Sequence, residues 1–271
     1  MRKTSIFLLI VLVGTFLISL KPESKFEVTP AEFGLKYRDV EFKTADGLTL
    51  KGWYFNPKTQ SGTVVILSHD GDGNMAKMIE LASYFTTLGV NVLTYDYRGF
   101  GSSDVFEINQ KFFIYGQFEK DLTAAVDFTK KLNGISQVFL YGKGMGAGLS
   151  IGVGAARRDV MKVIADCPYT NLNDFQKKYK EVKGEDILIP LAFNKEMLEP
   201  QYALAGKFAN LTKFLFVYGD KDLLYTTKDM KELAKINKDQ TETYVVKGAD
   251  YSSTFSTNKE AYFEQIKAFI K

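Results

Sequence analysis

The chain has 271 residues, of which 45% are hydrophobic and 25% are charged, a composition of folded globular proteins that argues against a disordered chain. The net charge of +3 at pH 7 falls to +1 without Arg2 and Lys3, and Lys and Arg do not cluster with aromatic residues, so nucleic-acid binding is not indicated. The single cysteine, Cys167, excludes an intramolecular disulfide and a cysteine-based metal site.

The N-terminal residues 1–20 have the pattern of a membrane-targeting segment. Arg2 and Lys3 precede 15 uncharged, mostly apolar residues, 6–20, which is typical of an export signal. As a helix this run spans about 22 Å, less than the ~30 Å of a bilayer's hydrocarbon core. Ser19 is the best candidate for the last residue before a cleavage site, so a cleaved signal peptide and a retained anchor both stay open. In either case we expect the remaining chain to be extracytoplasmic, that is, secreted, periplasmic or anchored.

Residues 21–31 are polar and predict a short tether, followed by one domain over 32–271. Two alternating runs flank Ala45-Asp46-Gly47 and predict a β-hairpin. Buried strands then alternate with amphipathic helices. The predicted strands are 37–43, 48–55, 64–68, 90–95, 138–141, 161–165, 214–218 and 243–246, and the predicted helices are 75–88, 118–132, 145–157, 230–236 and 259–270. This order predicts an α/β fold with an eight-stranded, mostly parallel sheet covered by helices on both faces, and leaves room for at most a small cap within 171–212.

The strand at 138–141 runs into a glycine-rich turn and a helix, which is the setting of a G-x-S-x-G nucleophile elbow with Gly144 in the central position. On this motif and four others in the same order, the chain resembles the α/β hydrolases of the bacterial esterase, serine-aminopeptidase-like and dienelactone-hydrolase-like kind. The five motifs lie at residues 68–74, 95–102, 142–146, 166–170 and 218–222.

The resemblance implies a catalytic triad of Ser, acid and His in that chain order. The acid position matches Asp222. The nucleophile position holds Gly144, and the His position holds Tyr251 or, with a one-residue shift, Asp250. The chain's single histidine, His69, falls in the oxyanion loop. The triad is therefore degenerate, since a serine–histidine relay lacks both its nucleophile and its base.

The oxyanion loop departs from the family in a second way, because Asp70 stands where glycine usually follows the histidine. A carboxylate there opposes the stabilisation of a developing oxyanion. Glycine at position 144 also has a structural explanation, since the elbow conformation is strained for any residue with a Cβ. No other nucleophile stands out: Ser150 is expected to be a buried helix serine hydrogen-bonded to backbone, and Ser102 and Ser103 follow a turn.

Two alternatives use the same residues. Gly142-x-Gly144-x-x-Ala147 with Asp166 imitates a dinucleotide-binding fingerprint, although three strand–helix units precede it. Four loop carboxylates at the ends of strands have the oxygens that Ca²⁺ or Mg²⁺ prefers, although aspartate is also an ordinary turn residue. They are Asp70, Asp72, Asp222 and Asp250. We favour neither alternative and expect no cofactor and no metal.

These observations predict an exported α/β-hydrolase-fold protein that is a pseudoenzyme. Its expected role is to bind a small acyl, peptide or lipid-like ligand or a partner protein, with membrane contact through residues 1–20 if they are not cleaved. Whether the protein is an enzyme stays open, because the alternative is a hydrolase of ester or amide bonds that uses a non-standard set of residues.

Overall fold

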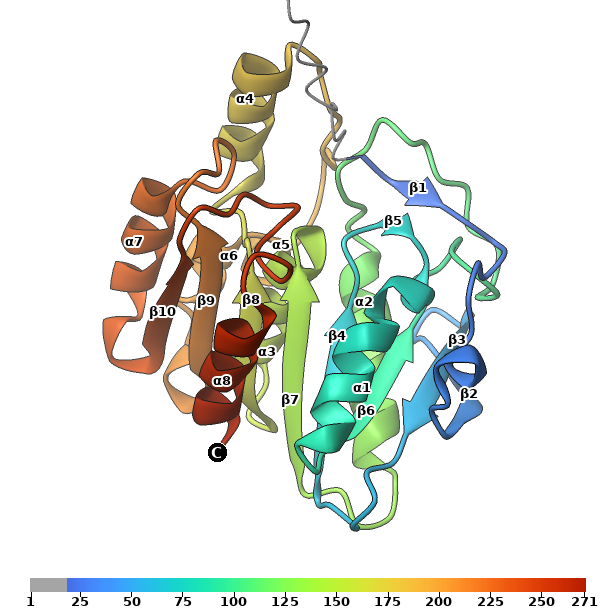
Figure 1. Ribbon diagram of the computed structural model, residues 1–271. Coiled ribbons are helices and arrows are strands. Elements are labelled where there is room, and N and C mark those ends of the chain that lie inside the picture. Colours follow the sequence, from blue (N-terminus) through green and yellow to red (C-terminus); the bar gives the residue numbers. More distant parts are fainter. Residues whose placement is uncertain (1–18) are drawn as a thin grey trace, which may run out of the picture.

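The computed structural model describes residues 19–271, which form a large mixed β-sheet with helices on both faces and a separate two-stranded sheet (Figure 1). The eight strands lie in the order β10-β9-β8-β7-β4-β6-β3-β2. The pairings β2–β3 and β3–β6 are antiparallel, and all other neighbours are parallel. The predicted eight-stranded, mostly parallel sheet is confirmed. Its strands are β2 (Tyr37–Lys43), β3 (Thr49–Phe55), β4 (Thr63–Ser68), β6 (Asn91–Tyr95), β7 (Gln137–Lys143), β8 (Val160–Asp166), β9 (Lys213–Gly219) and β10 (Thr241–Val246).

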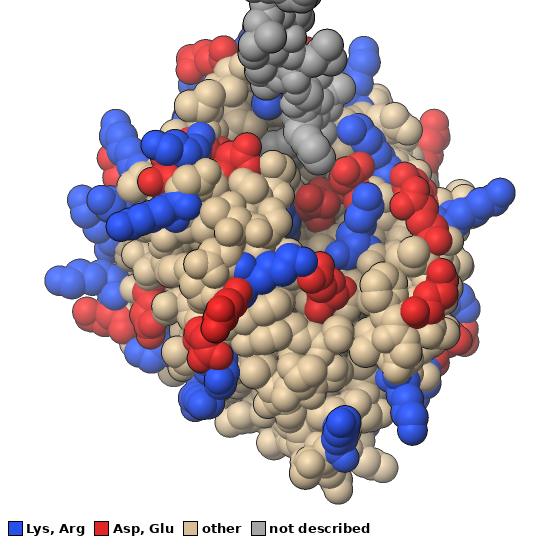
Figure 2. Space-filling view, in the orientation of Figure 1, with Lys and Arg blue, Asp and Glu red and all other residues tan. Residues whose placement is uncertain are grey.

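Helices cover both faces of the sheet, as a parallel sheet requires. Figure 1 shows α1 (Ile79–Thr87) and α8 (Lys259–Ile270) in front of the sheet and α2 (Phe118–Lys130) and α3 (Met145–Ala156) behind it. Lys and Arg are interspersed with Asp and Glu over the face seen in Figure 2. The remaining helices are α4 (Leu172–Lys183), α5 (Lys195–Leu198), α6 (Pro200–Ala203) and α7 (Thr227–Ile236), with short 3-10 helices η1 (Pro30–Phe33), η2 (Met75–Met78), η3 (Ala209–Leu211) and η4 (Lys238–Gln240).

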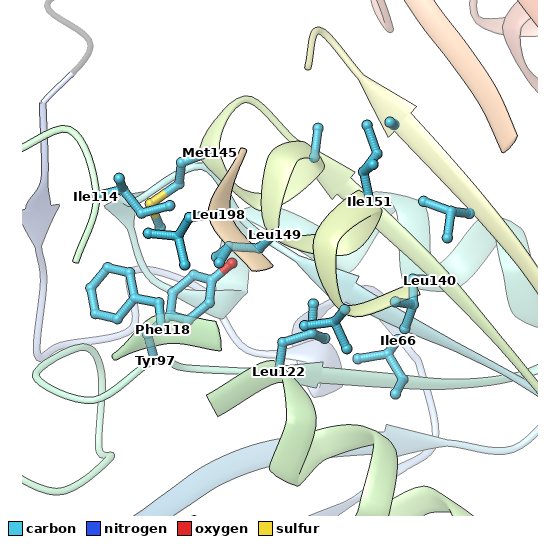
Figure 3. Close-up of a cluster of buried hydrophobic side chains, with 14 of the residues drawn as sticks. Ile66, Tyr97, Ile114, Phe118, Leu122, Leu140, Met145, Leu149, Ile151 and Leu198 are labelled. Atoms are coloured by element: carbon cyan, nitrogen blue, oxygen red, sulfur yellow. The ribbon is translucent and has the colours of Figure 1, made fainter. Parts of the chain in front are cut away.

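The two-residue period of the strands divides the core into two layers. In β7, Val138 and Leu140 face the layer under α2 and α3, whereas Phe139 and Tyr141 face the layer under α1 and α8. Figure 3 shows the first layer, where Leu140 lies near side chains of α2 and α3 such as Leu122. The central strands therefore bury side chains on both faces, which explains their unbroken apolar sequences.

The structure places residues 21–31 against the domain. Lys21–Pro22 form a short strand, β1, which pairs in parallel with β5 (Asp72–Gly73) of the loop after β4. Pro30 begins the helix η1 and is buried. The predicted tether is thus packed along much of its length. The predicted targeting segment lies almost entirely outside the described residues, and no helix within residues 19–271 is long and apolar enough to cross a membrane.

Helix α3 packs closely on the short helix α5, and this contact leads to a first prediction. A Cβ added to Gly152 would lie 1.9 Å from the backbone oxygen of Met197. We expect Gly152→Ala to lower the free energy of unfolding by about 1–3 kcal/mol in urea denaturation, because backbone must move to admit the methyl group. Gly116→Ala is the control, since its Cβ would be no closer than 3.5 Å to a neighbour. Equal stability of the two variants would contradict this packing argument.

Candidate active site

The turn after β7 has the geometry of a nucleophile elbow. Gly144 has φ 55° and ψ −115° and caps the N-terminus of α3. Its N–H donates a hydrogen bond to the carbonyl of Asp166 at 2.9 Å, which fixes the turn against β8. A side chain is also excluded two residues on, where a Cβ at Gly146 would lie 2.5 Å from the carbonyl oxygen of Ser68. The elbow therefore presents position 144 at the carboxyl edge of the sheet, but with no side chain on it.

The space above Gly144 is occupied by Tyr251. A Cβ built on Gly144 would lie 2.6 Å from the Tyr251 hydroxyl oxygen and 3.2 Å from the ring carbon Cε2. That hydroxyl donates a hydrogen bond to Asp70 Oδ2 at 2.6 Å. The ring stacks on Tyr225 with centroids 5.2 Å apart, and Lys143 Nζ lies 5.0 Å from the ring centroid. Three contacts thus hold Tyr251 over the elbow, and burial together with the Asp70 charge raises the pKa of its hydroxyl well above the usual range.

Asp222 lies in the loop after β9 and is buried. Its Oδ1 accepts hydrogen bonds from the N–H groups of Leu224 and Tyr225, both at 2.8 Å. Burial raises the pKa of this carboxyl, while the nearby backbone N–H groups of Tyr225, Leu224 and, less strongly, Tyr251 act to lower it. Within the described chain Oδ2 has no hydrogen-bond partner. The acid position is therefore beside the loop that carries position 251, with one oxygen unused.

Position 251, and not 250, faces the elbow. Asp250 points into its own turn, where its Oδ1 accepts hydrogen bonds from the hydroxyls of Ser252 and Ser253 at 2.7 and 2.6 Å. The structure brings together four of the five predicted site residues. They are Gly144, Tyr251, Asp70 and Asp222.

His69, the fifth predicted residue, is turned into the protein interior. Its Nδ1 accepts a hydrogen bond from the Gly71 N–H at 3.2 Å, and its Nε2 lies 3.9 Å from Asp96 Oδ1. The ring packs against Tyr97 and Phe100, with centroids 4.7 and 5.3 Å away. Burial lowers the pKa of the imidazole to about 4. His69 is therefore a neutral, buried side chain that holds the oxyanion loop through its hydrogen bond with Gly71.

The pair His69–Asp96 predicts a distinctive pH dependence. Burial raises the pKa of Asp96 to about 7, so native Asp96 retains a proton that the unfolded chain releases above its ordinary pKa of 3.8. His69 does the reverse, because the unfolded imidazole binds a proton below pH 6.5 and the native one only near pH 4. The first effect raises stability as the pH falls and the second lowers it, so the two oppose each other over this interval.

Asp96→Asn removes the compensating carboxyl. Relative to wild type, we expect this variant to lose about 1.4 kcal/mol of stability per pH unit as the pH falls from 6.5 towards 4, because only the His69 contribution remains. Urea denaturation at several pH values measures the difference. His69→Phe should instead gain stability relative to wild type as the pH falls over the same interval, because only the Asp96 contribution remains. Parallel pH profiles of wild type and Asp96→Asn would contradict the assignment.

Comparison with known proteins identifies the family. The family model for serine aminopeptidase, S33, matches residues 59–241, about two thirds of the chain. The chain belongs to the S33 serine aminopeptidase family. Its fold is that of esterase Pf2001 from Pyrococcus furiosus, with a TM-score of 0.76 and 21% sequence identity over 93% of this chain and 97% of that one.

Two curated relatives of this S33 protein show how far the sequence similarity extends. An uncharacterized protein of Mycobacterium tuberculosis is 30% identical over 139 residues, which is 50% of this chain and 47% of the relative. The chain thus matches about half the length of that protein. An uncharacterized membrane protein of Saccharomyces cerevisiae is 23% identical over 208 residues, 76% of this chain and 69% of the relative.

Three residues of the S33 site were not predicted as site residues: Lys143, Tyr225 and Cys167. Lys143 and Tyr225 hold the ring of Tyr251. Cys167 follows β8 and has φ 55°, the only positive φ at a non-glycine residue among residues 19–271. Burial, followed by the charges of Asp166 and Asp222, raises the pKa of its thiol well above the usual range. Its position directly after a strand was a signal, because this fold gathers its site at the carboxyl ends of strands.

Neither alternative ligand class is supported by the positions of the side chains. Asp166, which a dinucleotide fingerprint would place on a ribose, is fully buried, and its Oδ2 accepts hydrogen bonds from the hydroxyls of Tyr141, Thr254 and Tyr262. Within residues 19–271 no group of three or more His, Cys, Asp or Glu side chains is placed to hold a metal ion.

The serines weighed as substitute nucleophiles are also placed away from such a role. Ser150 is fully buried, but its hydroxyl has no hydrogen-bond partner among the described residues, which corrects the expected bond to backbone. The glycine-rich helix α3 is buried over nearly its whole length, and this packing encloses the serine. The Ser103 hydroxyl donates a hydrogen bond to the carbonyl of Asp96 at 2.8 Å, which stabilises the turn after β6.

A cavity of about 330 Å³ lies beside the site, between α4, α7 and the loop after β8. Its wall combines aromatic and aliphatic side chains, such as Phe175 and Leu224, with polar ones, such as Asn171 and Gln201. The volume falls within the range of small-molecule pockets. The cavity is separated from Gly144 by Tyr225, whose ring lies between Phe175 at 5.3 Å and Tyr251 at 5.2 Å.

Proposed function

We propose that this protein is a non-catalytic member of the S33 family that binds a small acyl, peptide or lipid-like ligand. We further propose that its N-terminal segment holds it outside the cytoplasm. One observation carries the proposal: the nucleophile position is a glycine, and the hydroxyl of Tyr251 fills the space that a nucleophile would need. Acyl transfer on this fold requires an oxygen or sulfur nucleophile there and a base to deprotonate it.

The neighbouring side chains support the same conclusion. Asp70 accepts the Tyr251 hydrogen bond where the family stabilises an oxyanion, and a carboxylate at that point opposes negative charge on a substrate. His69 is buried against Asp96 and its pKa is lowered, so it does not serve the elbow as a base. The thiol of Cys167 is buried with a raised pKa, and a thiol of that kind is a poor nucleophile.

The proposed attachment to the membrane is supported by the packing of Leu20, close to the N-terminal segment. The Leu20 N–H donates a hydrogen bond to the Phe112 carbonyl at 3.2 Å, and the Leu20 side chain is fully buried. Cleavage after Ser19 would turn that nitrogen into a charged ammonium group in a buried position, which is unfavourable. This favours a retained anchor, as does the similarity to a yeast membrane protein. Intact-mass measurement of the protein from its native membrane fraction tests this point.

The absence of catalysis is tested with a fluorophosphonate probe and short-chain p-nitrophenyl esters. We expect neither labelling nor turnover from the purified full chain, with an active esterase as the positive control. Labelling of a defined serine, threonine or cysteine would overturn the proposal and support the alternative, a hydrolase of ester or amide bonds with a non-standard set of catalytic residues. Ligand binding is tested separately by the thermal shift that fatty acids, acyl esters and short peptides produce.

A further inference from the structure

The described chain begins at the edge of the sheet where the site lies. Residues Lys21–Pro22 pair with Asp72–Gly73 of the oxyanion loop, and the Lys21 N–H bonds to the carbonyl of Gly71 at 2.8 Å. A Cβ added to Gly71 would meet Leu20 Cδ2 at 2.6 Å and Met145 Cε at 3.1 Å. The uncharged run 6–20 therefore ends inside the protein core, beside the residue that follows Gly144.

Two further segments continue from this point across the surface. The Leu20 N–H bonds to the carbonyl of Phe112 at 3.2 Å, the Phe113 N–H bonds to the carbonyl of Leu188 at 2.9 Å, and the Leu188 N–H bonds to the carbonyl of Lys111 at 2.8 Å. The segments that contain Leu20, Phe112 and Leu188 thus lie side by side. Figure 1 shows α4 and the chain that follows it rising at the same edge as β1.

This edge carries apolar side chains that face solvent. Val105 is 92% exposed and Leu191 is fully exposed, and Leu188 and Leu223 are also exposed. Val105 lies in the loop after β6 and Leu223 in the loop after β9, whereas Leu188 and Leu191 lie between α4 and α5, in the segment that pairs with residues 111–113 of the loop after β6. We call these four residues the apolar rim. Large apolar side chains that face solvent at the same edge of a sheet can together form a contact surface.

We propose that the apolar rim contacts the lipid surface of the membrane, so that the elbow and the neighbouring cavity face the bilayer. The inference rests on the proposed membrane anchor. Because Leu20 is packed in the core, no free linker separates the apolar run from the domain, and anchoring brings the rim to the lipid. A lipid-like ligand would then reach the cavity from the bilayer itself.

Charge does not account for this contact. Exposed lysines near the rim, such as Lys111 and Lys195, alternate with acidic residues, such as Glu107 and Asp186. Attraction to anionic lipid is therefore weak here, and the contact depends on burial of apolar side chains in the interface. The contact should accordingly persist in zwitterionic lipid and at high salt.

The test uses the full chain reconstituted in phosphatidylcholine vesicles. Four variants each carry one added cysteine. Val105→Cys and Leu191→Cys probe the apolar rim. Met161→Cys and Leu211→Cys are the controls, because these two exposed apolar residues lie at the amino ends of strands β8 and β9. Each variant is labelled with an environment-sensitive fluorophore. The unsubstituted protein controls for Cys167, which is buried.

Labels at 105 and 191 should emit at shorter wavelength and be quenched by doxyl lipids about twofold or more strongly than labels at 161 and 211, because rim residues enter the headgroup region. Equal quenching at all four positions in vesicle-bound protein would overturn the orientation while leaving the anchor intact. Failure of the protein to float with vesicles would overturn both the anchor and this inference. Neither result bears on catalytic inactivity, which the fluorophosphonate probe tests independently.

Discussion

Gly144→Ser is expected to remain inactive towards p-nitrophenyl esters and to be less stable than wild type by at least about 2 kcal/mol. A backbone φ of 55° strains a residue with a Cβ, at about 1–3 kcal/mol, and the new side chain overlaps Tyr251, which adds an overpacking cost. The serine also has no base to remove its proton. Urea denaturation measures the stability, and ester hydrolysis measures the activity.

Substitutions of Tyr251 separate the overlap from the backbone strain. Tyr251→Phe removes the oxygen 2.6 Å from the new Cβ but keeps ring carbons at 3.2 and 3.3 Å, whereas Tyr251→Ala removes the whole side chain. The cost of Gly144→Ser should therefore decrease from the wild-type background to Tyr251→Phe and again to Tyr251→Ala, as residues in contact do not contribute additively. The same cost in all three backgrounds would show that Tyr251 does not fill this space in solution.

The double variant Gly144→Ser with Tyr251→His tests the chemistry. It provides a hydroxyl at the elbow and an imidazole next to Asp222, whose Oδ2 has no partner among the described residues. We expect fluorophosphonate labelling in this variant and in neither single variant, because the two groups act as a unit. Labelling of the single variant Gly144→Ser would mean that another residue already supplies a base.

Asp121→Ala is expected to have a large effect on stability, about 3–5 kcal/mol, because Arg98 Nε and the Arg98 backbone N–H lose their buried acceptor and the guanidinium keeps only its partly exposed partner Asp46. Asp121 is fully buried in α2, where its Oδ1 accepts a hydrogen bond from Arg98 Nε at 2.8 Å and its Oδ2 accepts one from the Arg98 N–H at 3.0 Å. Arg98 also binds Asp46 of the β2–β3 hairpin at 2.9 Å. The network joins the hairpin, the loop after β6 and helix α2.

The matched control is an ion pair of similar chemistry on the surface. Lys180 and Asp186 are 62% and 69% exposed, so Asp186→Ala should change the free energy of unfolding by less than about 1 kcal/mol. Replacing both Arg98 and Asp121 by apolar residues of similar size should be less harmful than Asp121→Ala alone, because no charge is left buried. A small effect of Asp121→Ala would show that the ion pair with Asp46, or water, is enough to stabilise the Arg98 charge.

The amino-acid sequence by itself determined the sheet and which residues stand at the expected triad positions. Unbroken apolar runs such as 138–141 belong to strands that are buried on both faces, and this property is local enough to be recognised without the fold. That the histidine position of the triad holds no histidine follows from counting, since His69 is the only histidine of the chain and lies in the oxyanion loop. The position of Gly144 between a strand and a helix was likewise a local pattern.

The tertiary structure decided which side chains meet at the elbow. Tyr251 rather than Asp250 faces Gly144, and its hydrogen-bond partner Asp70 is 181 residues away in the sequence. Loop conformation sets such contacts, and loops carry no periodic signal. The same holds for Leu20, whose burial against Met145 depends on the pairing of β1 with β5. The local hydrophobic pattern indicates whether a segment is buried, whereas the side chains that it contacts depend on packing between segments far apart in the sequence.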